Sequence, residues 1–157
     1  MTILAMNLLL ALVWLALTGE ITPGNFALGF AAGYGALRVS RGVLPKTGYF
    51  GKLTQLARFA GFFLWELVKA NLRVAYDVLT PRHHMMPAVV AIPLDLETDE
   101  EITLLATLMT LTPGTLVLDV SRDRRTLYIH AMYVHDVEKT RAEIKNGFER
   151  RVMELLR

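Results

Sequence analysis

The first pattern along the chain is a pair of apolar runs separated by a polar break. Residues 3–17 are apolar apart from Asn7, and a second apolar run covers residues 26–37. The break at 18–24 contains Gly and Pro residues, which are typical of a turn. Each run is shorter than the roughly 20 apolar residues of an ordinary membrane span, so either the bilayer thins around the pair or flanking residues add length. The pattern predicts a short transmembrane helical hairpin, with helices at about 3–17 and 26–44.

The second apolar run has a spacing of small residues that bears on helix packing. Gly29 and Gly33 stand four residues apart, which lets a neighbouring helix approach the backbone closely. Chance in a segment rich in Gly and Ala explains the same spacing, so both interpretations stay open. A cleaved signal peptide is an alternative for the first run, but no basic residue precedes it and a second apolar run follows at once. We expect the hairpin to be retained.

A third helix, at about 53–80, is amphipathic. Its polar side chains fall within a sector of about 100° at helical spacing. They are Gln55, Arg58, Glu66, Lys69, Arg73 and Asp77. Glu66, Lys69 and Arg73 are candidates for ion coupling or for contact with a partner, because ionisable residues near lipid are costly unless they are paired. A solvated or partner-facing stripe is the simpler interpretation. The helix either lies along the membrane interface or crosses the bilayer obliquely.

The segment between the second and third helices indicates an orientation. It contains four basic residues and no acid: Arg38, Arg41, Lys46 and Lys52. Basic segments of this kind remain in the cytoplasm. Glycine and proline residues disfavour a helix at 42–51. The pattern predicts that residues 1–80 form the membrane region of a multi-pass protein of the cell membrane, with the C-terminal domain in the cytoplasm.

After Pro81 the periodicity changes to that of a mixed α/β domain, residues 81–157. A run at 88–94 is rich in β-branched and apolar residues, as expected of a strand. The next helix begins with Thr98 and Glu101, three residues apart, an arrangement that caps free N–H groups at a helix start. We expect this helix to continue to about residue 109.

The rest of this domain predicts a hairpin and a closing helix. Thr112-Pro113-Gly114-Thr115 has the residues of a type II turn, and strands are expected at 116–120 and 126–134. Asp136 then caps an amphipathic helix. The expected fold class is α+β, with the order βαββα, a ferredoxin-like half-sandwich without its usual last strand. Both helices are expected on one face of the sheet.

Composition narrows the chemistry. The 157 residues contain no cysteine, which excludes disulfides, thiol catalysis and cysteine zinc sites. The net charge of +2 is small and the basic residues are interleaved with acids, so nucleic-acid binding lacks support. At 53% hydrophobic residues and a mean hydropathy of +0.36, the chain is more apolar than a soluble domain of this size needs to be. Membrane lipid is the simplest explanation.

Histidines are the residues that invite a metal-site interpretation. His83 and His84 are adjacent in a Pro-bounded loop, and sequence neighbours rarely converge on one ion without further ligands. His130 and His135 stand five apart on an extended strand and therefore point to opposite faces. No nucleophile elbow, phosphate-binding loop or carboxylate pair occurs. We expect no catalytic residue, no cofactor, no metal and no enzyme activity.

Four stretches of the chain carry a family resemblance. They are Glu66-Leu-Val-Lys-Ala-Asn-Leu72, Leu104-Leu-Ala106, Leu111-Thr-Pro-Gly-Thr115 and Leu127-Tyr-Ile-His-Ala131. They resemble the E-type component of Mrp-type multisubunit cation/proton antiporters, also called Mnh or Pha, and the resemblance covers nearly the whole chain. The family commonly has Asn just after the Leu-Leu-Ala, where this chain has Thr107 and Met109 nearby. The resemblance implies a complex that exchanges cytoplasmic Na⁺ for external protons, with subunits of the A, B, C, D, F and G types as partners.

Within that family the large components of the A and D types are thought to carry the ion paths, so the resemblance implies an accessory role in assembly. The absence of a series of membrane-buried acids and bases in the sequence agrees with this role. Two other functions stay open. The first is direct participation in ion coupling through Glu66 and Lys69, and the second is a free-standing regulator anchored in the membrane.

Overall fold

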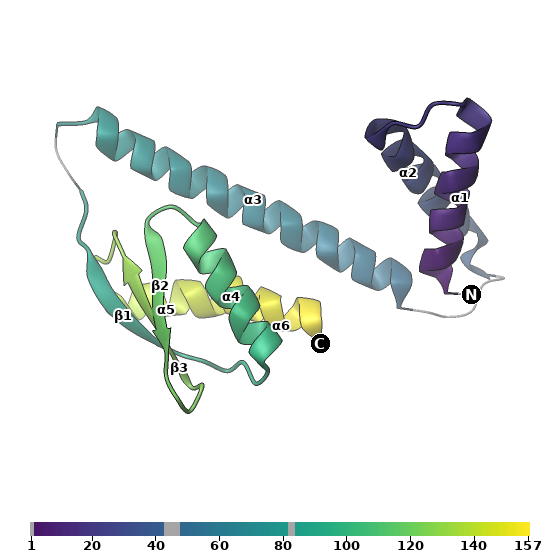
Figure 1. The fold of residues 1–157 in the computed structure, drawn as a ribbon. Helices are drawn as coiled ribbons and strands as arrows, with labels where there is room; N and C mark the ends of the chain where they lie inside the picture. The colour runs from purple at the N-terminus through teal and green to yellow at the C-terminus, as the bar shows by residue number, and fades with distance from the viewer. Residues whose placement is uncertain (1, 43–47, 82–83) are drawn as a thin grey trace. The chain divides into compact units, whose positions relative to one another are not determined.

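The computed structural model describes residues 2–42, 48–81 and 84–157, and Figure 1 shows the elements. Packing divides the chain into two compact units, Met1–Thr54 and Gln55–Arg157. Residues 55–80 group by packing with the α/β domain. The expected division after residue 80, between a membrane region and a cytoplasmic domain, stays a prediction. Lys46, His83 and the last two residues of the expected helix at 26–44 lie outside the described residues.

The first unit is built on a pair of packed helices, α1 (Ile3–Thr18) and α2 (Pro23–Val39), and a 3₁₀ turn (Ser40–Gly42) follows α2. Helix α2 begins three residues earlier than expected because Thr22 caps it. The Thr22 hydroxyl accepts a hydrogen bond from the Asn25 N–H at 3.2 Å, and proline fits the first turn of a helix. None of the helices in the described part of the chain combines the length and the apolarity of a membrane span.

Helix α3 (Tyr49–Leu79) begins before the expected position, so the loop predicted at 42–51 is wrong for its last three residues. Tertiary contacts hold this first turn. The Asn7 side-chain amide donates a hydrogen bond to the Tyr49 hydroxyl at 2.8 Å. The rings of Tyr49 and Phe50 lie 6.3 and 5.5 Å from that of Tyr34, between ring centroids. Local propensity contains no information on such contacts, so the sequence pattern placed the helix start too late.

The second unit contains the α/β domain, and its order βαββα confirms the expected α+β class. After α3 its elements are β1 (Ala88–Pro93), α4 (Asp99–Leu111), β2 (Thr115–Val120), β3 (Thr126–Ala131), α5 (Val137–Ile144), a π-helical turn (Lys145–Glu149) and α6 (Arg150–Leu156). The three strands form an antiparallel sheet in the order β1-β3-β2, so β1 and β2 are both edge strands.

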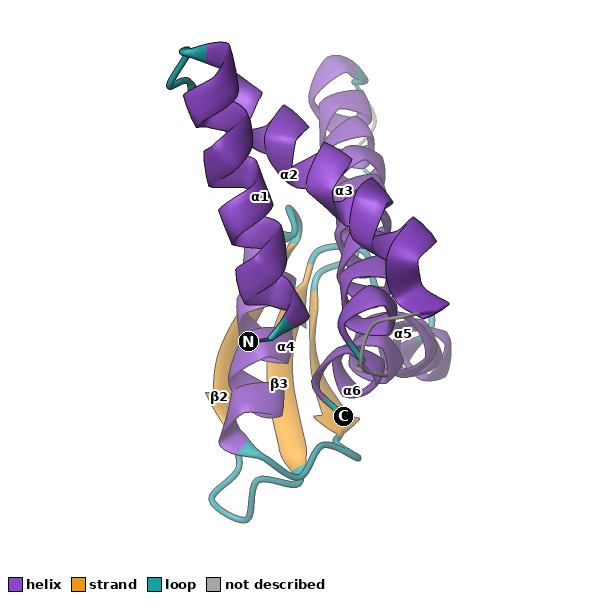
Figure 2. Ribbon diagram, turned by 90° about the vertical axis from the view of Figure 1, so that its right-hand side faces the viewer, coloured by secondary structure: helices purple, strands orange, loops and turns teal. Residues whose placement is uncertain are grey.

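Helices α4, α5 and α6 cover one face of this sheet, and Figure 2 shows α4 in front of the strands with α5 and α6 to their right. Alternate strand residues point into the core between the layers, as the two-residue period of a strand requires. The buried core includes Val90, Ile92, Leu127 and Ile129 from the strands, and Leu105, Met109, Phe148 and Val152 from the helices. The other face of the sheet exposes Val89, Leu116, Leu118 and Tyr128.

Two local signals of the sequence are confirmed. The Thr98 hydroxyl accepts from the Glu101 N–H at 3.2 Å, and the Glu101 carboxylate accepts from the Thr98 N–H at 3.3 Å, which is the expected capping box. At the predicted type II turn, Gly114 has φ +88°, a value that glycine adopts without strain. Both motifs depend on neighbouring residues alone, which is why the sequence contains enough information to predict them.

Two boundaries differ from expectation. Strand β3 ends at Ala131 because the following residues bond to a loop: the Met132 carbonyl accepts from the Met86 N–H, and the Val134 N–H donates to the Met86 carbonyl. The last helix contains an irregularity, since a π-helical turn at Lys145–Glu149 lies between the α-helical segments α5 and α6. Such single-turn insertions depend on tertiary packing and often occur at functional positions.

Candidate functional site

Helix α3 is held against the α/β domain by aromatic side chains. Phe59, Phe62 and Phe63 pack against the hydrophobic core of the domain. The Phe62 ring lies 5.4 Å from that of Phe148, and the Arg151 guanidinium carbon lies 3.8 Å from the Phe62 ring centroid. Phe62 is an apolar residue at a helical position among the polar residues of the predicted stripe. The stripe therefore contains the contact that joins α3 to the domain.

The three candidate residues of α3 line one cavity of about 170 Å³ on the domain side of the helix. The Lys69 ammonium donates to the Glu66 carboxylate at 2.7 Å, and the two side chains are 47% and 24% exposed. The Arg73 guanidinium carbon lies 5.3 Å from the ring centroid of Tyr133, within the range of a cation–π contact. The structure therefore brings Glu66, Lys69 and Arg73 together beside the α/β domain, in what we call the α3 groove.

Three of the four stretches that carry the family resemblance meet at the α3 groove. Its lining residues include Glu66, Lys69 and Ala70 from the first stretch, Thr112, Pro113, Gly114 and Thr115 from the turn, and Ile129 and Ala131 from β3. A hydrogen bond holds the turn in place, because the Thr115 hydroxyl donates to the Thr112 carbonyl at 2.9 Å. The motifs are far apart in sequence but share one location in the fold.

A second cavity, of about 330 Å³, is lined by residues from the C-terminal end of α3 and from the domain. Asp77 lies there with its side chain 3% exposed, and its Oδ1 is 3.3 Å from Nδ1 of His84. The second carboxylate oxygen of Asp77 and the Tyr133 hydroxyl are both buried and interact with each other, which lowers the pKa of Asp77. Burial raises the pKa of Tyr133, and the nearby Asp77 carboxylate adds to that shift, so the phenol stays protonated.

Sequence reasoning placed Asp77 on the polar stripe but did not identify Tyr133 or His84 as its neighbours. These residues come from segments with no shared motif, and no pattern in the sequence links them. In the described part of the chain no group of three or more His or acidic side chains is placed to hold a metal ion. His84 lies beside Asp77 and His130 lies on β3.

The two candidate packing glycines of α2 lie against α1. A Cβ atom added at Gly29 would lie 2.8 Å from the Trp14 Cβ, and one added at Gly33 would meet the Asn7 carboxamide and lie 3.0 Å from the Leu10 Cβ. Contacts this short leave no room for a side chain. Gly35, on the same helix, has open space around it.

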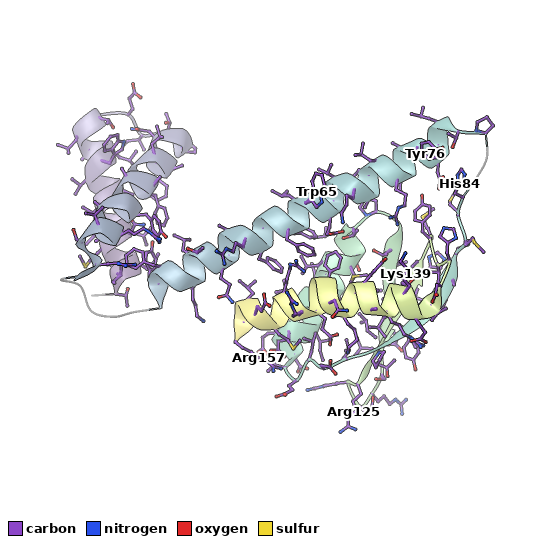
Figure 3. All side chains as sticks on the ribbon, turned by 180° about the vertical axis from the view of Figure 1, so that it is seen from behind. Trp65, Tyr76, His84, Arg125, Lys139 and Arg157 are labelled. Carbon is purple, nitrogen blue, oxygen red and sulfur yellow. The ribbon has the colours of Figure 1, made fainter. Side chains whose placement is uncertain are left out.

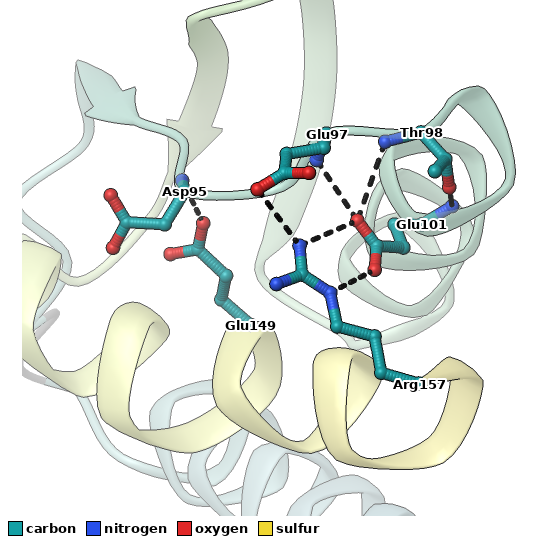
Figure 4. A network of polar contacts seen from close by, with 6 residues as sticks. All are labelled: Asp95, Glu97, Thr98, Glu101, Glu149 and Arg157. Atoms are coloured by element: carbon teal, nitrogen blue, oxygen red, sulfur yellow. Dashed lines mark hydrogen bonds and ion pairs between the residues drawn. The ribbon is translucent and has the colours of Figure 1, made fainter.

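Buried charges brace the α/β domain near its C-terminal end, as Figure 4 shows. The Glu101 carboxylate accepts from the Arg157 guanidinium at 2.8 Å and from the Glu97 N–H at 2.9 Å. These bonds, led by the Arg157 contact, lower the pKa of Glu101 to about 2. Glu149, in the π-helical turn, accepts from the Asp95 N–H at 2.6 Å. The described network is structural, since each carboxylate is engaged with backbone or with a neighbouring charge.

Comparison with known proteins identifies similar chains. The family model described as Na⁺/H⁺ ion antiporter subunit, MNHE, matches residues 7–155. The E-type component of the Na⁺/H⁺ antiporter of Bacillus subtilis is 38% identical over 97% of this chain and 96% of its own length. The corresponding component from Alkalihalophilus pseudofirmus is 37% identical over 96% of this chain and 95% of its own.

Two solved structures contain similar chains. One belongs to the structure of the Mrp complex from Dietzia sp. DQ12-45-1b, with a TM-score of 0.52 and 27% identity over 65% of this chain and 96% of that chain. The other belongs to the membrane-bound sulfane sulfur reductase, an archaeal respiratory membrane complex, with a TM-score of 0.59 and 28% identity over 98% of both chains. The likeness therefore extends over both units of the fold.

Proposed function

Because this chain belongs to the MNHE family of Na⁺/H⁺ ion antiporter subunits, we propose that it is an accessory, structural subunit of a multisubunit Na⁺/H⁺ antiporter complex in the cell membrane. Its partners are the other subunits of that complex, and its role is to support their assembly. Monovalent cation efflux and pH homeostasis are then activities of the whole complex, to which this chain contributes structure. The α/β domain, a ferredoxin-like half-sandwich, lies on the cytoplasmic side.

The observation that carries this proposal is apolar surface left open on both units. Leu9, Leu12 and Leu17 are exposed on α1, Leu72 is exposed on α3, and Leu118 is exposed on the free face of the sheet. A monomer in water rarely exposes contiguous apolar surface of this extent, and such surface is typical of contacts with lipid or with partner proteins. A subunit that is completed by its neighbours has this property.

The two similar solved chains also support a structural role. One is part of an Mrp complex and the other is part of a sulfane sulfur reductase, so complexes with different named activities contain a chain of this fold. Fold alone does not determine an activity. Two complexes with different activities can share a subunit whose role is to hold the membrane complex together.

The proposal places the hairpin in the membrane and the α/β domain on its cytoplasmic side, and cysteine labelling can test this placement. The hairpin of α1 and α2 lies in lipid, since residues 3–17 contain no charged side chain. The chain has no cysteine, so a single cysteine at the exposed position Arg125, as Arg125→Cys, reports one location. A membrane-impermeant thiol reagent should label it in inverted membrane vesicles and not in intact cells. Labelling in intact cells would contradict a cytoplasmic domain.

Direct participation in ion coupling is the second candidate, and it centres on Glu66 with Lys69. Glu66 lies 2.7 Å from Lys69, a partner that compensates its charge. We expect Glu66→Gln to leave both the recovery of the complex and the pH dependence of antiport unchanged. A shifted pH profile with normal assembly would favour the coupling role instead. Arg73, which contacts Tyr133, offers the corresponding test as Arg73→Gln.

Affinity purification in mild detergent tests the assembly role. With a tag on this chain, the other subunits should co-elute in constant proportion. The third candidate, a free-standing membrane-anchored regulator, predicts a stable monomer without co-eluting subunits. Recovery of the monomer alone from membranes that express the full set of subunits would therefore refute the proposed function.

A further inference from the structure

Helix α3 has two faces with different surroundings within the second unit. The face with Phe62, Glu66 and Asp77 is turned to the α/β domain, as its contacts with Phe148 and Tyr133 indicate. The opposite face exposes a strip of large apolar side chains. They are Leu64, Trp65, Val68, Leu72, Tyr76, Val78 and Leu79. Figure 3 shows Trp65 on the side of α3 that points away from the α5–α6 segment. We call these seven residues the outer strip.

One border of the outer strip carries a cation and amphipathic aromatic residues. Arg58 is exposed along that side. Trp65 and Tyr76, 62% and 59% exposed, lie next to it. Such rings prefer the level of lipid headgroups, and a cation beside them attracts anionic lipid. Glu66 and Asp77 face the domain together with Lys69 and Arg73, so these acids and bases offset one another there and not along the strip.

We infer that the outer strip of α3 lies in the headgroup–acyl boundary of an anionic bilayer leaflet, with the helix axis parallel to the membrane and the α/β domain on its aqueous side. This inference rests on the proposed function, because it takes the hairpin of α1 and α2 to be in lipid. Since α3 follows that hairpin in the chain after a short connection, its first turns begin near the membrane surface.

The domain contacts on α3 decide against an oblique span. They extend from Phe59 to Asp77, and a helix rises about 1.5 Å per residue, so the domain follows the helix for about 27 Å. A helix that crossed the bilayer would carry the polar surface of the domain into hydrocarbon, which is prohibitive without partners for its polar groups. A helix in the interface keeps the whole domain in water.

One polar side chain on the exposed side is neutralised by the helix itself. The Asn71 side-chain amide donates to the Leu67 carbonyl at 2.7 Å, which lowers the cost of placing it near acyl chains. The pattern is that of an amphipathic helix that lies in an interface plane, with its apolar side buried about 5–10 Å in the headgroup–acyl boundary.

Tryptophan fluorescence of the full chain in vesicles tests this placement, because the chain contains two tryptophans. The vesicles contain phosphatidylglycerol and phosphatidylcholine, the latter brominated either near the headgroup or near the methyl end of the acyl chain. Trp14→Phe leaves Trp65 as the reporter, and Trp65→Phe leaves Trp14. The matched control carries both changes and Arg125→Trp, which places the reporter at the hairpin tip that Figure 3 shows far from α3. Circular dichroism checks that each variant is folded.

We expect bromine near the headgroup to quench Trp65 by roughly two-fold and more strongly than bromine near the methyl end, as an interfacial depth requires. The reporter at position 125 should be unaffected. A second probe, Leu72→Trp in the chain without Trp14 and Trp65, should behave like Trp65. Quenching of Trp65 no stronger than that at position 125, or stronger from the methyl end, would overturn the inference.

Trp14 separates the failure of this inference from the failure of the proposed function. If Trp14 is quenched while Trp65 is not, the hairpin is in lipid and the outer strip is not, so only this inference falls. If neither tryptophan is quenched, the proposed lipid placement of the hairpin falls, and the inference falls with it.

Discussion

Glu101 and Arg157 form an ion pair that joins the start of α4 to the C-terminal residue of the chain. Glu101 is buried and also accepts hydrogen bonds from two backbone N–H groups, so its carboxylate is held in the charged form. Its pKa of about 2 lies below 4.5, the ordinary value of a glutamate side chain in water. A carboxyl group with this sign of shift stabilises the folded state above about pH 4.5, and that contribution is lost as the pH falls toward 2.

Glu101→Gln should therefore lower the free energy of unfolding by about 2 kcal/mol at neutral pH, because the amide cannot accept the same charge-assisted bonds. The difference between the variant and the native chain should shrink as the pH falls below 4.5. Thermal unfolding of the full chain in detergent, measured over a pH series, checks this. Glu100→Gln, on the same helix but exposed, is the control and should be nearly neutral. A constant difference at all pH values would contradict the assignment.

Gly33 makes a second prediction at the residue scale, which concerns the packing of α1 on α2. Gly33→Ala should destabilise the chain by about 1–3 kcal/mol, because the added methyl group would overlap the Asn7 carboxamide. Gly35→Ala, on the same helix with open space around it, should be neutral or stabilise by up to about 1 kcal/mol. Thermal unfolding in detergent compares the two. Equal effects would show that α1 and α2 do not pack at Gly33.

Among the elements, α3 depends most on a single aromatic contact with the domain. Phe62→Ala removes the ring that contacts Phe148 and Arg151, and it should weaken the docking of α3 by about 2 kcal/mol, since Phe62 is only partly buried. Hydrogen exchange of α3 amides should then become faster, while amides of the sheet stay protected. Leu64→Ala, which removes an exposed side chain two residues away, is the control and should leave exchange unchanged.

The sequence predicted the elements of the α/β domain better than it predicted the surroundings of α3. The capping box of Thr98 and the positive φ of Gly114 are local features, and both are confirmed. The periodicity of α3 identified a polar face, but periodicity does not show which part of the protein packs against that face. The face of α3 with Glu66 meets the α/β domain through contacts with residues more than 40 positions away in the sequence. A local pattern could not predict those contacts.

Contacts between residues distant in sequence also explain why the sequence did not predict some helix boundaries and some residues of the candidate site. Helix α3 starts at Tyr49 because of contacts with Asn7 and Tyr34, and the π-helical turn before Arg150 arises in a packed helix. The candidates on α3 were chosen from one helix. Tyr133, which lies beside Arg73, comes from a segment without a motif, so no spacing rule could identify it.

For the whole molecule, each exposed surface has a different proposed neighbour. The hairpin contacts lipid and partner helices, the outer strip of α3 contacts the membrane boundary, and the free face of the sheet remains for the cytoplasmic side of the complex. The residues of the α3 groove then act in docking α3 to its own domain.

A charge reversal tests the membrane contact at this scale. Replacing Arg58 by Glu should weaken the attraction of the outer strip to anionic lipid, because each charge near the surface is worth about 1 kcal/mol. The headgroup-level quenching of Trp65 should fall in vesicles rich in phosphatidylglycerol and change little in neutral vesicles. The same substitution at Arg125, at the hairpin tip, is the control. Equal loss in both vesicle types would contradict an electrostatic contribution.

The most direct test of the accessory role is to delete this chain from the full set of subunits and to measure both the recovered complex and the Na⁺/H⁺ antiport per recovered complex. We predict that deletion greatly lowers the yield of complex, and that the residual complexes exchange ions with an unchanged pH dependence. Normal yield with abolished or shifted antiport would contradict the accessory role and would place this chain in the ion path.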